Sequence, residues 1–207
     1  AIVWRQLRRN KGAMFGAFLV IFLVVIALFA PYVAPHDPLE QTLSDALKPP
    51  STTYFFGTDE VGRDIFSRII WGTRIALIVG LSSALFALVL GVPLGLISAY
   101  VGGPLDRGLT LIMDSLYAFP GLILAISVAA VLGAGIGNII IAIAVLYVPT
   151  YFRIVRGQVL SVKQDLYIEA ARSLGAKSRT ILWRYIFPNV IPSVVIIFSV
   201  NVADAIL

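Results

Sequence analysis

Residues 169–176 read Glu-Ala-Ala-Arg-Ser-Leu-Gly-Ala, and Ile-Phe-Pro follows at residues 186–188. This charged stretch separates two strongly apolar runs, one at about 136–152 and one from 188 onwards. The two adjacent alanines let a partner surface approach the backbone closely, and Gly175 tolerates the left-handed conformation in which many helices end. The spacing therefore predicts a helix, a glycine turn and a second short helix that lie along a membrane surface.

The predicted helices of this stretch are amphipathic. Leu166, Ala170 and Leu174 recur at every fourth position and form one apolar face. Ser178 is placed to cap the second helix, and the apolar stripe of that helix comprises Ile181, Leu182, Tyr185 and Ile186. Such a segment either docks on a partner protein or rests on the membrane surface without one.

The composition indicates an all-α polytopic membrane protein. Of the 207 residues, 59% are hydrophobic and only 13% are charged, whereas soluble domains carry about 25% charged residues. Several apolar runs are long enough to cross a hydrocarbon core of about 30 Å as helices. No segment shows the alternation of a membrane β-strand.

Five membrane-spanning helices are expected from the apolar runs, at about 13–34, 73–101, 109–132, 136–152 and 188–207. The predicted organisation is a cytoplasmic N-terminus (1–12), a first span (13–35), an extracytoplasmic segment (36–72) and a core (73–207) with a cytoplasmic loop (153–187).

The distribution of charge assigns the two sides of the membrane. Basic residues without acids precede the first span, and basic residues also prevail in the loop 153–187, whereas acidic residues prevail in the segment 36–72. By the positive-inside rule the N-terminus and the loop are cytoplasmic. The formal net charge of +5 therefore reflects topology, and we do not expect a nucleic-acid partner.

Several kinds of chemistry lack the residues they need. There is no cysteine, and the single histidine, His36, is expected to be a surface loop residue, so no metal site is predicted. The sequence contains no P-loop motif, no HExxH and no GxSxG, so this chain should not hydrolyse ATP. A membrane enzyme would need titratable residues that converge at one depth, and only Asp114 and Asp204 are available.

Asp114 is predicted near the cytoplasmic end of the third span, and Asp204 is predicted towards the outer end of the fifth span. Carboxylates inside a membrane are costly, so each either forms a local hydrogen bond or ion pair, or lines a translocation path. Pro120 should kink the third span because it removes a backbone donor. The spacings Gly91xxxGly95 and Gly133xxxGly137 suit close packing of helices.

A polar cluster is predicted in the extracytoplasmic segment. Turns at Gly57 and Gly62 would bring together a set of charged side chains from residues 59–68. The members that we single out are Asp59, Glu60, Arg63 and Asp64, together with Arg68. The cluster either caps the outer mouth as a self-paired structure or contacts a substrate-binding protein; both roles are compatible.

The stretch from Glu169 to Pro188 resembles the EAA loop of ABC importer permeases, in which E-A-A-x2-x-G-A is followed by I-x-P; Phe187 stands where leucine is more usual. Phe56–Arg68, Gly95–Asp106 and Asp114–Pro120 resemble segments of dipeptide and oligopeptide permeases. The similarity covers nearly the whole chain and favours the C-type subunit, because the partner subunit usually lacks the G-T-D-x-x-G-R-D segment.

The resemblance implies the ABC importer type I permease fold in a prokaryotic plasma (inner) membrane. It implies a second permease subunit, two cytoplasmic ATPase subunits that bind ATP and Mg²⁺, and an extracytoplasmic substrate-binding protein; no cofactor is expected in this chain. The ATPase-coupling residues would be Glu169, Ala170, Ala171, Arg172, Ser173, Leu174, Gly175 and Ala176.

The resemblance leaves the substrate open. Dipeptides or oligopeptides are expected first, and glutathione, nickel chelates or oligosaccharides are alternatives, as is a structural membrane protein that transports nothing. The family has six spans in this subunit, so we also expect the native chain to continue beyond Leu207.

Overall fold

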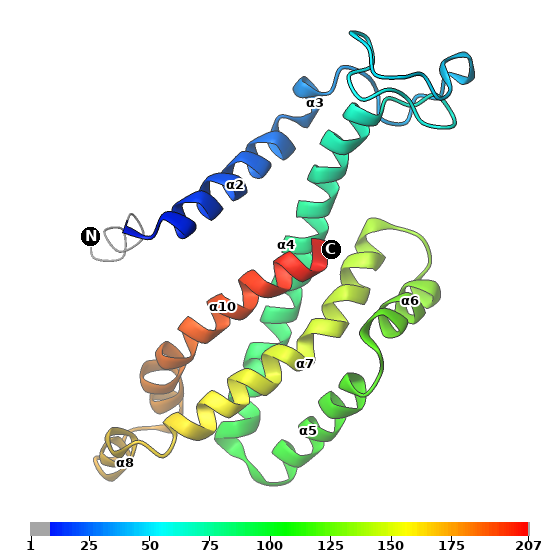
Figure 1. The fold of residues 1–207 in the computed structure, drawn as a ribbon. Coiled ribbons are helices and arrows are strands. Elements are labelled where there is room, and N and C mark those ends of the chain that lie inside the picture. Colours follow the sequence, from blue (N-terminus) through cyan, green and yellow to red (C-terminus); the bar gives the residue numbers. More distant parts are fainter. Residues whose placement is uncertain (1–8, 207) are drawn as a thin grey trace. The chain divides into compact units, whose positions relative to one another are not determined.

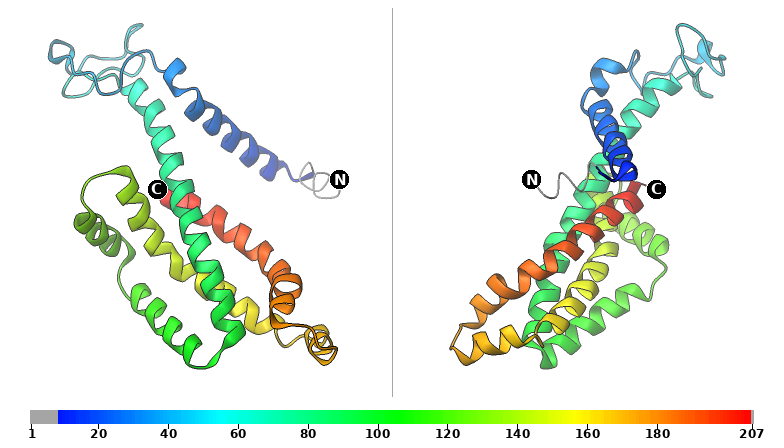
Figure 2. Two further views of the ribbon diagram at one scale, coloured as in Figure 1. Left: turned by 180° about the vertical axis from the view of Figure 1, so that it is seen from behind. Right: turned by 60° about the vertical axis from the view of Figure 1, so that its left-hand side comes forward.

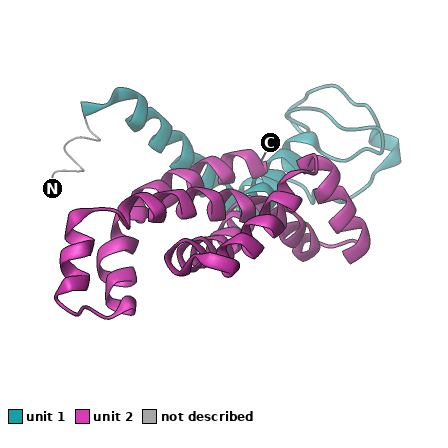
Figure 3. Cartoon of the chain, turned by 90° about the horizontal axis from the view of Figure 1, so that it is seen from below, with its two compact units in different colours: residues 1–78 teal, residues 79–207 magenta. Residues whose placement is uncertain are grey.

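The computed structural model describes residues 9–206. These residues form helices and loops, without a strand; an isolated bridge pairs Thr58 with Asp64. The chain divides into two compact units, residues 1–78 and 79–207 (Figure 3). The expected all-α class is confirmed.

The first unit contains the first apolar run. Helix α2 (Lys11–Leu28) begins behind Asn10, whose side chain accepts a hydrogen bond from the Ala13 amide at 3.1 Å. The run is interrupted at Phe29 and continues as the short helix α3 (Ala30–Val33). Most side chains of α2 are exposed, as expected for a helix that faces lipid. Residues 1–8 of the predicted N-terminus, including Arg5 and Arg8, lie outside the described residues.

An irregular segment with one 3₁₀ turn, η1 (Leu43–Asp45), leads to helix α4 (Ile65–Val101). This helix begins earlier than the predicted boundary at 73, inside the segment that was predicted to be extracytoplasmic. The reason is local: the carboxylate of Asp64 accepts a hydrogen bond from the Ser67 amide at 3.1 Å, as an N-cap residue does. A polar first turn therefore extends the apolar helix.

The second unit is a helical assembly around α7. Figures 1 and 2 show α7 between α5 and α6 on one side and α10 on the other. Buried side chains of α7 form much of its core, among them Tyr151, Phe152, Val155 and Val159. The elements of this unit after α4 are α5 (Gly103–Tyr117), α6 (Gly121–Leu132), α7 (Ile136–Val162), α8 (Leu166–Ser173), α9 (Ser178–Thr180), the π-helix η2 (Ile181–Ile186) and α10 (Phe187–Ile206).

The predicted third span is broken rather than kinked. Helices α5 and α6 meet at Phe119-Pro120 with a bend of 94°. Pro120 occupies the N-cap position of α6, where its missing N–H costs no helical hydrogen bond. With the bent pair counted as one span, the described residues contain five candidate membrane spans, and otherwise four.

Only one of the two predicted glycine pairs packs closely. A Cβ atom at Gly91 would lie 2.6 Å from Cβ of Tyr151, and one at Gly95 would lie 2.7 Å from the carbonyl oxygen of Phe152. Glycine therefore lets α4 touch the backbone of α7. The prediction was wrong for Gly133 and Gly137, because nothing lies within 4 Å of a Cβ at either position. Gly133 instead has φ +87° and ends α6.

We expect Gly91→Ala to destabilise the protein, because its new methyl group would overlap α7. Overpacking of this kind costs about 1–3 kcal/mol, so the midpoint of thermal unfolding of the purified protein in detergent should fall. Gly108→Ala is the matched control, since a Cβ there meets nothing within 4 Å. Equal midpoints for the two variants would contradict the close contact of α4 with α7.

Candidate functional site

Helix α8 lies at one end of the second unit, after α7 (Figure 1). Its inward side is formed by Ile168 and Ala171, with exposures of 0% and 8%. Leu166 and Leu174 of the predicted apolar face are exposed by 82% and 88%. The helix therefore packs against the rest of the chain through one side, and the two leucines at its ends are exposed on the other side.

The predicted coupling residues are mostly accessible. Ala171 is buried against the protein and Ala176 is half-buried. The others are exposed, namely Glu169, Ala170, Arg172, Ser173, Leu174 and Gly175. A carboxylate, a guanidinium and an apolar side chain are thus presented together to the outside of the chain.

A Schellman motif ends α8 at the predicted glycine. Gly175 has φ +79°. Its amide donates to the carbonyl oxygen of Arg172 at 2.9 Å, and the amide of Ala176 donates to that of Ala171 at 3.0 Å. This is the 5→2 and 6→1 pattern that needs a left-handed residue. The turn therefore has a defined conformation that depends on glycine.

The π-helix η2 supports α8 from behind. Ile168 belongs to the same buried core as Ile181 and Ile186 of η2. Nδ2 of Asn189 donates to the hydroxyl of Tyr167 at 3.1 Å. A single turn of π-helix inside a longer helix frequently marks a functional region.

Two details of the predicted loop were wrong. Ser178 does not cap a second helix: Lys177 holds the N-cap position, with no side-chain hydrogen bond, and Ser178 is the first helical residue. The second helix is also not separate, because α9, η2 and α10 form one continuous run from Ser178 to Ile206 that contains Pro188. Since α7 extends to Val162, the connection between the long helices is shorter than the predicted 153–187.

Polar contacts that the sequence did not reveal join α7 to its neighbours near this loop. Arg156 donates to both carboxylate oxygens of Asp106, at 2.6 and 2.7 Å, and Ser98 donates to the same carboxylate at 2.6 Å. Nζ of Lys163 donates to the carbonyl oxygen of Tyr100 at 2.9 Å. These contacts connect α4, α5 and α7 at the start of the loop. The only sign of this ion pair in the sequence is that residues 106 and 156 carry opposite charges. Their wide separation in the sequence prevented the pairing from being predicted.

The two intramembrane acids lie in different places. Asp114 accepts a hydrogen bond from Arg153 at 2.8 Å, and the same guanidinium lies 4.4 Å from the centre of the Tyr117 ring. Asp204 accepts a hydrogen bond from the hydroxyl of Tyr147 at 2.9 Å. Each acid therefore has the local partner that was one of the two alternatives, and the structure does not bring the two carboxylates into one site.

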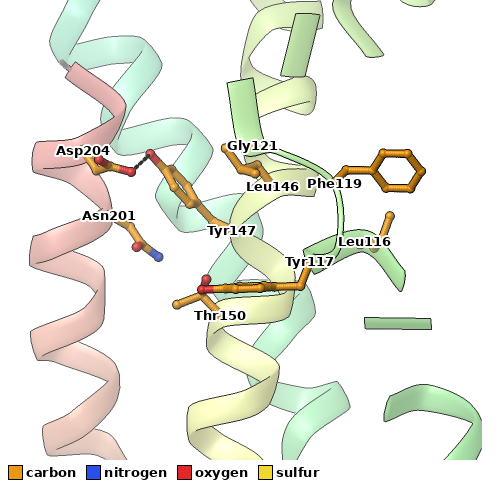
Figure 4. A pocket seen from close by; sticks show the side chains of 9 residues that line it. All are labelled: Leu116, Tyr117, Phe119, Gly121, Leu146, Tyr147, Thr150, Asn201 and Asp204. Carbon is orange, nitrogen blue, oxygen red and sulfur yellow. Dashed lines mark hydrogen bonds between the residues drawn. The ribbon is translucent and has the colours of Figure 1, made fainter. Parts of the chain in front are cut away.

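Asp204 also lines a cavity of about 470 Å³ at the break between α5 and α6 (Figure 4). The cavity is bounded by α5, α6, α7 and α10. Its lining residues are Leu116, Tyr117, Phe119, Gly121, Leu146, Tyr147, Thr150, Asn201 and Asp204.

The polar cluster of the first unit forms only in part as predicted. Asp59 accepts from Nε of Arg63 at 2.7 Å and from Arg68 at 3.2 Å. Gly57 and Gly62 have φ +76° and +79°, as the predicted turns require. Glu60 is exposed.

Asp64 belongs to a separate group in the same unit. Its buried carboxylate accepts from the hydroxyl of Ser67 at 2.6 Å and lies 3.4 Å from Nδ1 of His36. His36 therefore lies in a loop, as expected, but its side chain is half-buried against an acid.

These contacts lower the pKa values of the acids outside the membrane spans. Partial burial acts to raise the pKa of Asp59 and of Asp64, but hydrogen bonds from Arg63 and Val61, and from Ser67 and His36, outweigh it and leave both pKa values lowered. The hydrogen bonds from Lys48 and Tyr54 lower the pKa of Asp45.

The first unit's polar segment should therefore loosen in acid and not near neutrality. An aspartate with a lowered folded pKa stabilises the fold above the unfolded value of about 3.9, and this stabilisation is lost as the pH falls through the folded pKa. A spin label on Thr53→Cys should have constant mobility from pH 8 to 5 and higher mobility below about pH 4.

Glu60→Gln is the control for this titration, because Glu60 is exposed, and it should leave the profile unchanged. Asp59→Asn should raise the mobility at neutral pH. A transition between pH 6 and 7 would contradict the assignment to aspartates.

The described residues hold no group of three or more His, Cys, Asp or Glu that could bind a metal ion. The arrangement instead consists of apolar helices, a braced loop helix and a cavity at a broken span. These features are those of a polytopic α-helical membrane protein.

Residues 91–207 match the family of the binding-protein-dependent transport system inner membrane component, and residues 1–50 match the N-terminal TM domain of oligopeptide transport permease C. The chain belongs to this family of ABC importer permeases.

Three similar proteins are glutathione transport system permease proteins GsiD. The protein of Pectobacterium atrosepticum is 42% identical over 205 residues, and those of Escherichia coli O6:K15:H31 and Shigella boydii serotype 4 are each 44% identical over 205 residues. Each alignment covers 99% of this chain and 68% of the relative. Permeases of this family are membrane-spanning transport subunits.

Proposed function

We propose that this chain is the C-type permease subunit of an importer for dipeptides or oligopeptides, and that α8 couples it to ATPase subunits. The observation that carries the proposal is the surface of α8. Leu166 and Leu174 are exposed by 82% and 88%, while Ile168 holds the helix from behind. Large exposed apolar side chains on a braced helix suit a protein partner.

The proposed assembly contains a second permease subunit, two cytoplasmic ATPase subunits and an extracytoplasmic substrate-binding protein. ATP and Mg²⁺ bind to the ATPase subunits, and this chain supplies no catalytic residue. ATP-driven closure of the ATPases moves α8 as a unit and biases the helices between inward-facing and outward-facing states. The proposed coupling surface comprises Glu169, Ala170, Ala171, Arg172, Ser173, Leu174, Gly175 and Ala176.

The remaining candidate residues have proposed roles along the route that the substrate takes through the transporter. Asp59, Glu60, Arg63 and Asp64 contribute to the outer mouth or to contact with the binding protein, and the exposed Glu60 is the best placed to meet a partner. Asp114 and Asp204 belong to the translocation path. The support for this role is stronger for Asp204 than for Asp114, because Asp204 lines the cavity at the α5–α6 break (Figure 4).

Glutathione is the second candidate substrate, because the similar proteins are named glutathione permeases. Uptake of a labelled dipeptide, a labelled pentapeptide and labelled glutathione by the complete transporter in proteoliposomes separates the candidates. Uptake of glutathione alone would replace the peptide assignment.

Glu169→Lys and Gly175→Val should uncouple transport without preventing membrane insertion. The first reverses a charge on the exposed face, and the second forces a β-branched residue into φ +79°. Co-purification of the ATPase subunits and ATP-dependent uptake should both fall at least about tenfold, a change that corresponds to about 1.4 kcal/mol.

Leu174→Ser is the sharper variant, because an 88% exposed side chain contributes little to folding, so a loss of ATPase binding would reflect docking. Gln164→Ser is the control, an exposed residue of the same loop outside the proposed surface. Full uptake by both Glu169→Lys and Leu174→Ser would refute the coupling role.

The proposed topology places the N-terminus and α8 in the cytoplasm and residues 36–64 outside. The chain has no native cysteine, so single cysteines report accessibility directly. Ser51→Cys should react with a membrane-impermeant maleimide added to intact cells, and Ser178→Cys should react only after permeabilisation. The opposite pattern would invert the topology.

A further inference from the structure

The cavity at the α5–α6 break has the size and the lining of a small-ligand site (Figure 4). Its volume of about 470 Å³ falls within the range of about 300–1,000 Å³ found for ligand pockets. Leu116, Phe119, Leu146 and the ring of Tyr117 give it an apolar and aromatic wall, and its polar groups come from α5, α7 and α10, with Asn201 and Asp204 on α10.

Asn201 provides the observation that points to a ligand. It is only 5% exposed and it lines the cavity; its side chain lies beside the buried hydroxyl of Tyr151, and neither its Nδ2 atom nor that hydroxyl has a hydrogen-bond partner of good geometry among the described residues. A buried donor without a partner costs about 1–3 kcal/mol, so such a group needs an explanation. An acceptor atom of a bound molecule in the cavity would satisfy it.

Asp204 lies three residues further along α10, on the same face of the helix. Tyr147 donates to Oδ2 of Asp204 at 2.9 Å, which orients the carboxylate and leaves Oδ1 to receive another donor. Asp204 is exposed in this chain, and the dashed line in Figure 4 shows its carboxylate held at the cavity. A carboxylate so placed attracts a cation and repels an anion.

A free carboxylate oxygen beside an unpaired amide donor matches a particular ligand chemistry. It suits an ammonium group that is followed at once by a carbonyl oxygen, which is the amino-terminal residue of a peptide. The aromatic and aliphatic wall suits the side chain of that residue. Phosphates and other anions are disfavoured by Asp204.

We propose that this cavity is a substrate subsite for the amino-terminal residue of a peptide, with Asp204 receiving the ammonium group and Asn201 donating to the first peptide carbonyl. The inference rests on the proposed peptide transport and names the part of the substrate that the permease itself recognises. Binding at the subsite is weak, because a transported molecule must also leave it.

The first experiment measures uptake by the complete transporter in proteoliposomes. The probe is radiolabelled alanyl-phenylalanine, with the binding protein at saturation. Asp204→Asn should lower the maximal rate at least about tenfold, while the peptide concentration for half-maximal uptake is unchanged. Asp204→Glu keeps the charge and should retain more activity than Asp204→Asn.

Ser199→Ala is the control on the same helix, since the hydroxyl of Ser199 bonds to the carbonyl oxygen of Val195 and the residue does not line the cavity. It should transport normally. Wild-type uptake of peptide with an unchanged rate in Asp204→Asn would overturn the subsite and leave the proposed function intact. Failure of the wild-type transporter to take up any peptide would instead overturn the proposed function.

The second experiment needs no variant and therefore does not depend on folding of the Asp204 variants. Saturation-transfer NMR on the wild-type complex, without the binding protein, compares alanyl-phenylalanine with its N-acetylated form. The free peptide should show contact with the protein, and the acetylated peptide, which lacks the ammonium group, should show at least about tenfold less. Equal signals for the two peptides would overturn the proposal.

Discussion

The packing of neighbouring helices onto α7 is the interaction on which the second unit depends. Helices in lipid gain no hydrophobic advantage from association, so they rely on van der Waals contact of their surfaces. Gly91 and Gly95 provide it by bringing α4 onto the backbone of α7 beside Tyr151 and Phe152. Because α5, α6 and α10 also pack on α7, the positions of the cavity walls follow from this one helix.

The same helix leads into the loop that carries α8. Arg156 and Lys163, near its end, hold Asp106 of α5 and the last turn of α4. Charge-assisted, bidentate hydrogen bonds are strong and directional. The end of α7 that leads into the loop is therefore fixed to both α4 and α5. The π-helix η2 gives α8 a second attachment, through Ile181 and Ile186, so the loop is fixed on its inner side and free on its outer side.

Local conformational chemistry explains which features could be predicted from the sequence. Gly175 and Pro120 act on their own backbone, so the turn and the interruption of the third span could be predicted with no knowledge of neighbours. Periodicity identified an apolar face on α8, but not whether that face meets the rest of the chain or the outside. The structure places Leu174 outwards and Ile168 inwards, and that choice depends on the distant helix η2.

Pairings between residues far apart in sequence were the other gap. Asp106 with Arg156, and Asp204 with Tyr147, each join different helices. A single sequence contains the charges but not the distances between them. The polar segment of the first unit shows the same limit, because the contact of His36 with Asp64 depends on a loop path that no local pattern encodes. The predicted start of the second span was wrong for a related reason. Capping by Asp64 extends α4 into a segment that hydropathy alone did not assign to a helix.

The break between α5 and α6 follows from the constraint that makes the rest of the protein helical. Backbone polar groups in lipid must be satisfied internally, so non-helical backbone is tolerated only where it is buried in protein or lines a polar cavity. The break at Phe119-Pro120 lies beside a cavity whose polar lining residues come from α5, α7 and α10, with Asn201 and Asp204 among them (Figure 4). An intramembrane carboxylate likewise needs a cavity or a partner, and Asp204 has both, the partner being Tyr147. The interrupted helix and the carboxylate of Asp204 thus border the same cavity, which relieves the cost of both among helices that are otherwise almost entirely apolar.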